Sequence, residues 1–294
     1  MQNAGTAALK RSLRRLAWAG VCRLPKRELV ILTENGRFAV SNKDRVIGKK
    51  LFVDRSYELA DIDFFVSFLK RAGWLAERPI VADVGANLGM ISIAMLLRGH
   101  FREAVAFEPF PETMQRLLGN IERNGLQDRV RAWPLAMSSQ RGSATLSLSP
   151  DNSGDHRIED SGPKAGEFHE ERRRRVAVET ASFDEWMAET GYDPRRIGLI
   201  WLDVQGYEGQ FLAGARRSLE ARIPVVTEIW PYALERTGLG CAGFLRLVGE
   251  LFPFFHDGSP DRREPEPIAR LAEIVAGLRS KRDMTQVALI PRGR

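Results

Sequence analysis

The segment 80–97, with the sequence IVADVGANLGMISIAMLL, constrains the fold of this chain more than any other part of it. Its apolar run, 79–84, shows no alternation of apolar and polar residues, which is typical of a strand buried on both faces of a parallel sheet. An apolar helix is expected at about 88–98. Gly85 and Gly89 stand between strand and helix, and we expect them to let a ligand approach the backbone where a β-carbon would collide.

Strands and helices alternate from residue 79 to residue 230. Further apolar runs predict strands at 104–108, 129–133, 197–204 and 223–230, and helices are expected at 111–125 and about 208–220. This alternation predicts an α/β fold with a doubly wound, mostly parallel sheet. In such sheets, ligands bind beyond the carboxyl ends of the strands.

Weaker patterns surround this core. We expect a hairpin at 28–41, a helix at 58–73, short strands at 143–149 and 175–180 around a polar stretch at 149–175, helices near 241–251 and 266–280, and a last strand at 285–291. We divide the chain into an N-terminal extension, 1–75, with a basic helix, the hairpin and a capping helix, and a ligand-binding domain, 76–294.

The positive charge of the chain is concentrated near its N-terminus. The net charge is +6, but residues 1–50 alone carry 12 Lys and Arg against 3 Asp and Glu. The remainder is slightly acidic, so we do not expect a body that binds nucleic acid. Leu9, Leu13 and Leu16 share one face of the predicted basic helix. This helix could dock on the core, or it could contact a membrane surface or another anionic partner.

Cysteine and histidine usage points to no metal centre and no disulfide framework. Cys22 and Cys241 lie far apart, and the four histidines are dispersed. We see no signal peptide and no stretch of about 18 apolar residues, and we therefore expect a cytoplasmic protein.

A second acidic position identifies the expected ligand. Glu108 ends the second strand, 25 residues after Asp83, where a carboxylate can accept both hydroxyls of a ribose. Asp83 stands before the first glycine, where its charge would repel a pyrophosphate but suits a cationic ligand. S-adenosylmethionine has one ribose, an ammonium group, a sulfonium centre and no phosphate. We expect Asp83 to hold its amino-acid end and Glu108 its sugar, with Asn87, Gly85 and Gly89 completing the cofactor site.

Five segments resemble the FkbM-type methyltransferases, a family of class I S-adenosylmethionine-dependent enzymes. They are, in order, DVGANLG, AFEPFPETMQRLLGNIERNGL, ASFDEW, IWLDVQGYEGQFLAGARRSL and VVTEIW. The resemblance covers about 79–230 and extends more weakly upstream to YELADIDFF. It implies a Rossmann-like sheet of the seven-stranded type and methylation of a hydroxyl on a sugar, a glycan or a natural product. Gln205 departs from the family, which commonly has Glu at this position.

Three carboxylates are expected to converge beyond the fourth and fifth strands. A hydroxyl acceptor benefits from a group that takes its proton, and Asp203 is the first candidate. Glu208 could belong to the site or begin the following helix, and Glu228 ends the fifth strand. Such a cluster could instead hold a divalent cation, although we expect no metal.

His156 lies in a polar segment, NSGDHRI, that is similar to one found in a subset of the family. It could act as a base or contact the substrate, with Asp155 as its partner, or it could be an ordinary surface residue. The arginine run 172–175 is expected to be a solvated entry to a strand, although it could face an anionic substrate.

Two other classes of protein remain possible from the sequence. One is a binding module that keeps the cofactor fold without catalysis. The other is a nicotinamide-dependent oxidoreductase, which would need a small residue at position 83 and a third glycine. Enzymes that methylate the amino groups of bases carry a Pro-Pro-Tyr motif after their fourth strand. The similar sequence WPY in this chain follows the fifth strand, so we do not expect methylation of base amino groups. The acceptor and the oligomeric state are left open.

Overall fold

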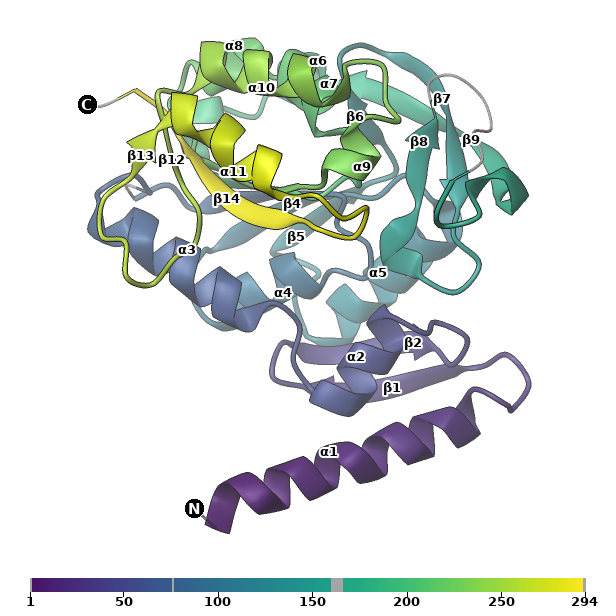
Figure 1. Ribbon diagram of the computed structural model, residues 1–294. Coiled ribbons are helices and arrows are strands. Elements are labelled where there is room, and N and C mark those ends of the chain that lie inside the picture. Colours follow the sequence, from purple (N-terminus) through teal and green to yellow (C-terminus); the bar gives the residue numbers. More distant parts are fainter. Residues whose placement is uncertain (1, 76, 160–165, 293–294) are drawn as a thin grey trace.

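The computed structural model describes residues 2–75, 77–159 and 166–292, and a large central sheet organises the chain (Figure 1). The strand order of this eight-stranded sheet is β13-β12-β14-β11-β10-β3-β4-β5. Its parallel strands are β5 (Val130–Trp133), β4 (Glu103–Phe107), β3 (Ile80–Val84), β10 (Ile197–Leu202) and β11 (Val225–Ile229). Its antiparallel end consists of β14 (Thr285–Ile290), β12 (Phe254–His256) and β13 (Glu266–Pro267). The predicted α/β class with a mostly parallel sheet is confirmed.

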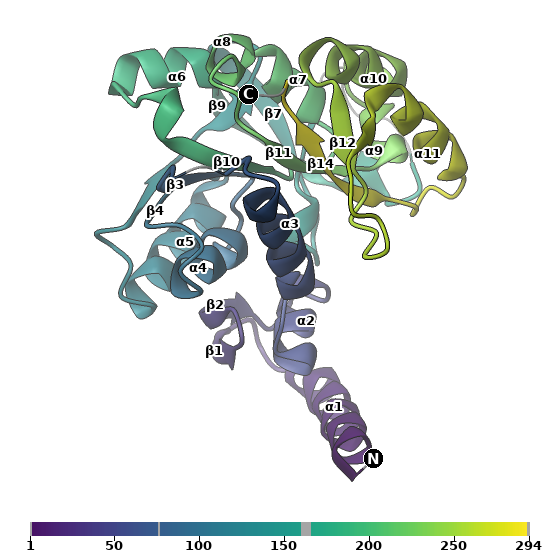
Figure 2. The same cartoon turned by 90° about the vertical axis from the view of Figure 1, so that its left-hand side faces the viewer.

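Helices cover both faces of this sheet (Figure 2). One layer contains α3 (Leu59–Arg71), α4 (Met90–Leu97) and α5 (Pro111–Arg123). The other contains α6 (Phe183–Thr190), α7 (Glu208–Ala213), α8 (Arg216–Leu219), α10 (Gly240–Leu251) and α11 (Leu271–Gly277). In β3, Val81 belongs to the first apolar cluster while Ile80, Ala82 and Val84 belong to the second. This split explains the continuous apolar run, because successive side chains of a strand point to opposite faces.

The helix predicted at 208–220 is interrupted. It divides into α7 and α8 at Gly214, where a β-carbon would lie 2.0 Å from the carbonyl oxygen of Ser138. The close approach of a separate chain segment therefore ends the first helix, and no local pattern in the sequence reports it. The short α9 (Pro231–Leu234) follows β11.

A second sheet of four strands, which the sequence did not predict as a unit, lies beside the first. Its order is β6-β9-β7-β8, with β6 (Ala136–Ser138), β9 (Arg174–Ser182), β7 (Gly142–Leu148) and β8 (Arg157–Glu159). Short 3₁₀ turns occur at Ser153–Asp155, Glu170–Arg172, Pro194–Arg196 and Ile268–Arg270. Part of the predicted polar stretch, 160–165, lies outside the described residues.

The N-terminal extension consists of α1 (Gln2–Val21), the hairpin of β1 (Glu28–Thr33) and β2 (Gly36–Ser41), and α2 (Ile47–Asp54). The predicted hairpin is confirmed. Its β2 strand is attached to α5, where the Asn120 side chain accepts a hydrogen bond from the Ala39 amide at 2.7 Å. A boundary at residue 75 stays a prediction, because α2 and α3 share one apolar cluster with the central sheet. Within the described ranges, none of the helices combines the length and apolar character that crossing a membrane requires.

Candidate active site

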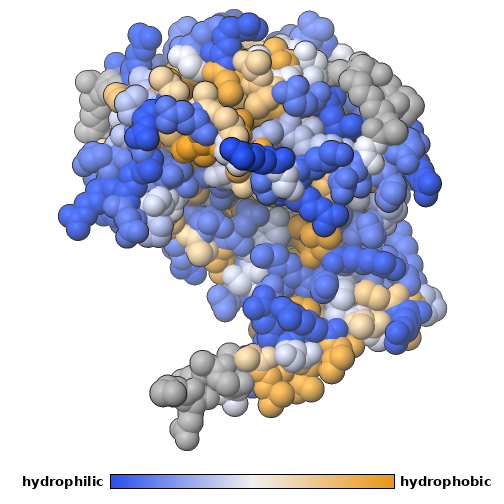
Figure 3. Space-filling model, in the orientation of Figure 1, coloured by the Kyte–Doolittle hydropathy of each residue, from blue (hydrophilic) through white to orange (hydrophobic). Residues whose placement is uncertain are grey.

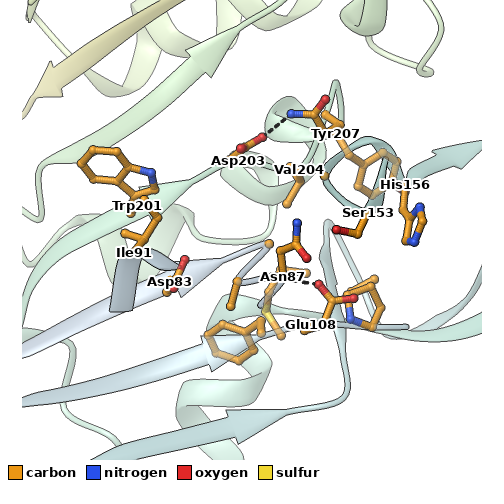
Figure 4. A pocket seen from close by; sticks show the side chains of 18 of the residues that line it. Asp83, Asn87, Ile91, Glu108, Ser153, His156, Trp201, Asp203, Val204 and Tyr207 are labelled. Atoms are coloured by element: carbon orange, nitrogen blue, oxygen red, sulfur yellow. Dashed lines mark hydrogen bonds between the residues drawn. The ribbon is translucent and has the colours of Figure 1, made fainter. Parts of the chain in front are cut away.

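A cavity with about 850 Å³ of empty space lies at the carboxyl ends of β3, β4 and β10 (Figure 4). Four carboxylates line it, those of Glu58, Asp83, Glu108 and Asp203. Among the residues that the structure describes, no Lys or Arg contributes to this lining. Such a cavity favours a cationic ligand and disfavours a pyrophosphate, which requires donors of positive charge.

Asp83 lies near the end of β3 with only 1% of its surface exposed. Its Oδ2 accepts a hydrogen bond of 3.0 Å from the amide of Ser92, in the first turn of α4. Burial raises the pKa of Asp83 to about 6, and this hydrogen bond limits the rise. Asp83 therefore connects strand and helix while it also lines the cavity.

Glu108 is held by two backbone amides. Its Oε1 accepts from the amide of Phe110 at 2.9 Å, and its Oε2 accepts from the amide of Asn87 at 3.1 Å. Burial raises the pKa of Glu108 to about 7. Asn87 has a left-handed backbone with φ of 49°, and its buried side-chain oxygen finds no partner among the described residues. A buried acceptor without a donor is costly, so this oxygen suits a ligand that can donate to it.

The structure adds a packing reason for the two glycines. Both have positive φ, 86° for Gly85 and 85° for Gly89. A β-carbon on Gly85 would lie 1.9 Å from the carbonyl oxygen of Asp203, and one on Gly89 would lie 2.7 Å from Cδ1 of Leu117. Each glycine therefore admits a neighbouring part of the protein, and the approach of a ligand to this backbone stays a prediction. Gly85 lines the cavity, whereas Gly89 lies beside it in the packing of α4 against α5.

Asp203 and Glu228 lie at the ends of β10 and β11 and are joined by the side chain of Gln205. The Gln205 amide nitrogen donates to Oδ1 of Asp203 at 2.6 Å and to Oε1 of Glu228 at 3.2 Å. Burial raises the pKa of both carboxyl groups, and the charge of Asp203 contributes further to the rise for Glu228, to about 9. Two of the predicted carboxylates are thus brought together, and the residue that departs from the family pattern connects them.

A wider cleft opens from the cofactor cavity. It is open to solvent, spans about 1800 Å³, and shares Tyr57, Glu58, Gly154, Asp203 and Gln205 with the cavity. Burial and the nearby Asp203 raise the pKa of Glu58 to about 8. Sequence reasoning did not propose Tyr57 or Glu58, although they begin the YELADIDFF segment that weakly resembles the family. The resemblance of this segment to the family could have identified these two residues.

Glu208 is not placed to take part in the chemistry. Its Oε1 accepts hydrogen bonds of 3.1 Å from the amides of both Val204 and Gly206, and only 2% of the residue is exposed. It lines neither the cavity nor the wide cleft. Of the two roles considered from the sequence, the structure supports the one at the helix start, where Glu208 fixes the preceding turn.

His156 lines the cavity but is not paired with Asp155. Its Nδ1 accepts a hydrogen bond of 3.1 Å from the amide of Ser149, and burial lowers its pKa to about 4. The ring is therefore neutral near pH 7 with its proton on Nε2, which makes it a donor and not a base. Asp155 instead binds Arg157 and Arg173, each at 2.5 Å. Arg173 is 5% exposed, so the expectation of a solvated arginine run is wrong at this position.

Comparison with known proteins agrees with this geometry. Residues 83–256 match the model of the methyltransferase FkbM domain. The chain belongs to the FkbM methyltransferase family. It is 31% identical over 189 residues to 2-O-methyltransferase NoeI of Sinorhizobium fredii, a match covering 60% of this chain and 72% of that protein. It is also 27% identical over 154 residues to the hexuronic acid methyltransferase AglP of Haloferax volcanii, covering 52% of this chain and 56% of that protein.

Among solved structures, an FkbM methyltransferase from Methylobacillus flagellatus aligns with a TM-score of 0.44 and 14% identity. That alignment covers 76% of this chain and 47% of the other.

The family member described here is an S-adenosylmethionine-dependent methyltransferase, and its cavity fits that cofactor. The acidic lining suits the sulfonium and ammonium charges, and the unpartnered oxygen of Asn87 can accept from a donor of the ligand. Among the described residues, no group of three or more His, Cys, Asp or Glu side chains is arranged to hold a metal ion.

Proposed function

We propose that this methyltransferase methylates a hydroxyl group of a saccharide or of a small natural product. The observation that carries the proposal is the pair of carboxylates, Asp203 and Glu228, that Gln205 joins where the cofactor cavity meets the wide cleft. A hydroxyl loses its proton when it is methylated, and a carboxylate at this position can accept that proton. The printed names of NoeI and AglP, a 2-O-methyltransferase and a hexuronic acid methyltransferase, support an oxygen acceptor on a sugar.

Each residue of the pair has a distinct role in this proposal. In this proposal Asp203, which accepts the shorter hydrogen bond from Gln205, 2.6 Å against 3.2 Å, is the member of the pair that ionises first. Glu228, with its pKa raised to about 9, keeps its proton and can donate to the acceptor. Asp203 then takes the proton of the hydroxyl group, while Gln205 holds both carboxyl groups in position.

The residues of the cofactor site hold and orient S-adenosylmethionine. When bound, S-adenosylmethionine supplies an activated methyl group on sulfur. We infer that Glu108 accepts the ribose hydroxyls while the amides of Asn87 and Phe110 fix its carboxylate. Asp83 and the side-chain oxygen of Asn87 face the positively charged amino-acid end.

The wide cleft is shaped for an acceptor larger than a few atoms. Phe168 and Trp230 form part of its wall with their rings 5.3 Å apart in an edge-to-face arrangement. Polar side chains, among them Asn152 and Asp151, lie in the same lining. A mixture of aromatic and polar groups suits a saccharide, which presents apolar C–H faces and hydroxyl edges.

Transfer from methyl-labelled S-adenosylmethionine tests the proposal. Purified protein is incubated with neutral sugars, uronic acids, amino sugars and polyketide alcohols, and products are identified by mass spectrometry and by the chemical shift of the labelled methyl. We expect an O-methyl product from at least one class, which the Asp203→Asn variant forms about 10²-fold more slowly or not at all. A label attached to nitrogen or carbon would contradict the proposal, as would an O-methyl product formed equally well by that variant.

A further inference from the structure

The helix α1 has two faces, and only one of them is occupied by the protein. Trp18 is 3% exposed and packs with its ring 5.2 Å from that of Phe52 on α2. On the same side of the helix, Arg11 Nε lies 2.6 Å from Oδ1 of Asp54. These contacts attach α1 to the body, from which it extends along the edge of the molecule (Figure 1).

The opposite face of α1 is apolar and exposed. Leu9, Leu13 and Leu16 are spaced by four and three residues and therefore form one stripe along the helix. They are 61%, 57% and 72% exposed. Figure 3 shows this apolar surface at the end of the molecule that α1 forms. Large apolar side chains gathered on one exposed face indicate a surface that another body covers.

The charge around this stripe indicates what that body is. Residues 1–27 contain seven Lys and Arg and no Asp or Glu. Of these, Lys10 is exposed at the flank of the stripe, Arg15 is exposed nearer to the face that carries Trp18, and Arg14 is half-buried. A second copy of the helix would bring like charges together, whereas anionic lipid headgroups would be attracted to them. A basic helix with a leucine face is typical of segments that lie in the interface of a membrane.

A groove beside this helix has one lining residue in common with the active site. It is open to solvent, spans about 1040 Å³, and is lined by Arg11 and Arg14 of α1, by Lys50 of α2 and by the acidic residues Glu34, Asp54, Glu58 and Asp61. Glu58 also lines the cofactor cavity and the wide cleft. Glu58 is therefore common to the groove beside α1 and to the two hollows of the active site.

We propose that α1 binds the surface of an anionic membrane, with Leu9, Leu13 and Leu16 inserted among the lipids and the flanking basic residues on the headgroups. A single short apolar stripe gives reversible binding that depends on lipid charge and on salt. This inference does not depend on the identity of the methyl acceptor.

Sedimentation of the full chain with vesicles tests this inference. Vesicles of phosphatidylcholine alone are compared with vesicles containing about 30% phosphatidylglycerol. We expect binding only to the anionic vesicles and a decrease of about tenfold or more when the salt concentration is raised to about 0.5 M. A protein that remains in the supernatant with both vesicles at low salt would overturn the inference.

Two variants make the test specific. Replacing Leu9, Leu13 and Leu16 together by Ser should reduce binding by about tenfold or more. The matched control replaces Val30 and Leu32 by Ser, because these are equally exposed apolar residues, 63% and 66%, on a strand without the basic stripe. The control should bind as the parent does, and both variants should keep S-adenosylhomocysteine affinity and circular dichroism.

Light scattering, which measures the oligomeric state, tests whether a second copy of the chain covers this face instead of a membrane. If the parent protein is a dimer that the leucine variant converts to a monomer, and neither binds vesicles, a second copy covers this face and the inference fails. It fails as well if the leucine variant binds anionic vesicles as tightly as the parent.

Discussion

The two halves of the sheet's carboxyl edge use the same chemical group in different ways. At β3 and β4, the carboxylates of Asp83 and Glu108 accept hydrogen bonds from backbone amides. At β10 and β11, Asp203 and Glu228 share a single side-chain donor, the amide of Gln205. The first pair is held by backbone amides, whereas in the second pair one side chain joins the two carboxyl groups and the backbone of Gln205 also bonds Asp203.

This difference indicates a division of roles. Backbone amides cannot rotate away, so a carboxylate that they hold keeps its position when a ligand binds. A pair of carboxyl groups that are joined by a side chain and cannot both ionise easily is suited to taking up and releasing a proton. We therefore assign ligand holding to the β3–β4 half and proton transfer to the β10–β11 half. Variants of Asp203, Glu108, Gln205 and Glu228 test this assignment.

The largest expected effect comes from removing the charge of Asp203. Asp203→Asn keeps an oxygen that can accept from Gln205 but cannot take a proton from the acceptor. We expect kcat to fall by about 10²-fold or more, while the affinity for S-adenosylhomocysteine changes by less than about twofold. Single-turnover kinetics and calorimetric titration measure the two quantities. Unchanged turnover in this variant would transfer the role of proton acceptor away from the β10–β11 half.

The second effect concerns the β3–β4 half of the sheet edge, to which we assign the binding of the cofactor. Glu108→Ala should weaken the binding of S-adenosylhomocysteine by about 1.5–3 kcal/mol, which corresponds to roughly tenfold or more, through loss of charge-assisted hydrogen bonds to the ribose. Glu208→Ala is the matched control. Glu208 is also buried, also accepts two backbone amides and also has its pKa raised to about 7, yet it lines no part of the cavity.

Both alanine variants should lower the melting temperature, since each leaves two amides without their acceptor. Only Glu108→Ala should change the dissociation constant measured by calorimetry. Equal losses of affinity in the two variants would mean that Glu108 acts on the fold and not on the ribose.

Much of the fold was predictable because it is encoded locally. The apolar runs at 79–84 and 197–204 correspond to β3 and β10, and the hairpin follows from the Asn35-Gly36 turn. The positions of Asp83 and Glu108 at the carboxyl edge follow from the strand ends alone. Local patterns of burial and turn chemistry are sufficient for such features.

The site was less predictable, because its contacts join distant parts of the chain. Gly85 is required by the carbonyl of Asp203, 118 residues later, a contact that no local pattern reports. Asp155, its sequence neighbour, was considered as a partner for His156, but the backbone of Ser149 holds the ring. Gln205 was recognised only as a departure from the family, while its function as a bridge depends on Glu228, which belongs to the next strand.

A third, smaller effect is expected from removing the hydrogen-bond donor of Gln205. Gln205→Met keeps the length of the side chain and removes its donor. A hydrogen bond to a carboxylate lowers its pKa, so losing this one should raise the pKa of the Asp203–Glu228 pair. We expect kcat at pH 7 to fall by about tenfold and the acidic limb of its pH profile to move to higher pH. The Michaelis constant for the cofactor should stay the same, because Asp83 and Glu108 are untouched.

Gln205→Asn keeps the amide donor but should also have a reduced kcat, because its shorter side chain cannot reach both carboxyl groups. A pH profile identical to that of the parent would show that Gln205 fills space without influencing the proton acceptor, and the contrast between the two halves would lose its chemical basis.

The smallest effect is on stability. In the folded protein the pKa of Glu228 is raised to about 9, above its value in an unfolded chain, so the folded state binds a proton that the unfolded state releases. This contribution to stability is present at low pH and is lost as the pH rises through the folded value. The same sign holds for Glu58, with its pKa raised to about 8. The melting temperature should therefore decrease by several degrees between about pH 7 and pH 9.5.

Glu228→Gln removes one of these titrations and should flatten the decrease, as measured by circular dichroism on heating across this range. Glu220→Gln is the control, because Glu220 is exposed on the surface at the end of α8. It should leave the slope unchanged. If Glu228→Gln shows the same slope as the parent, Glu228 is ionised in the folded state at neutral pH. The pair at β10 and β11 would then hold two charges, and the proton that distinguishes this half of the sheet from the other would be absent.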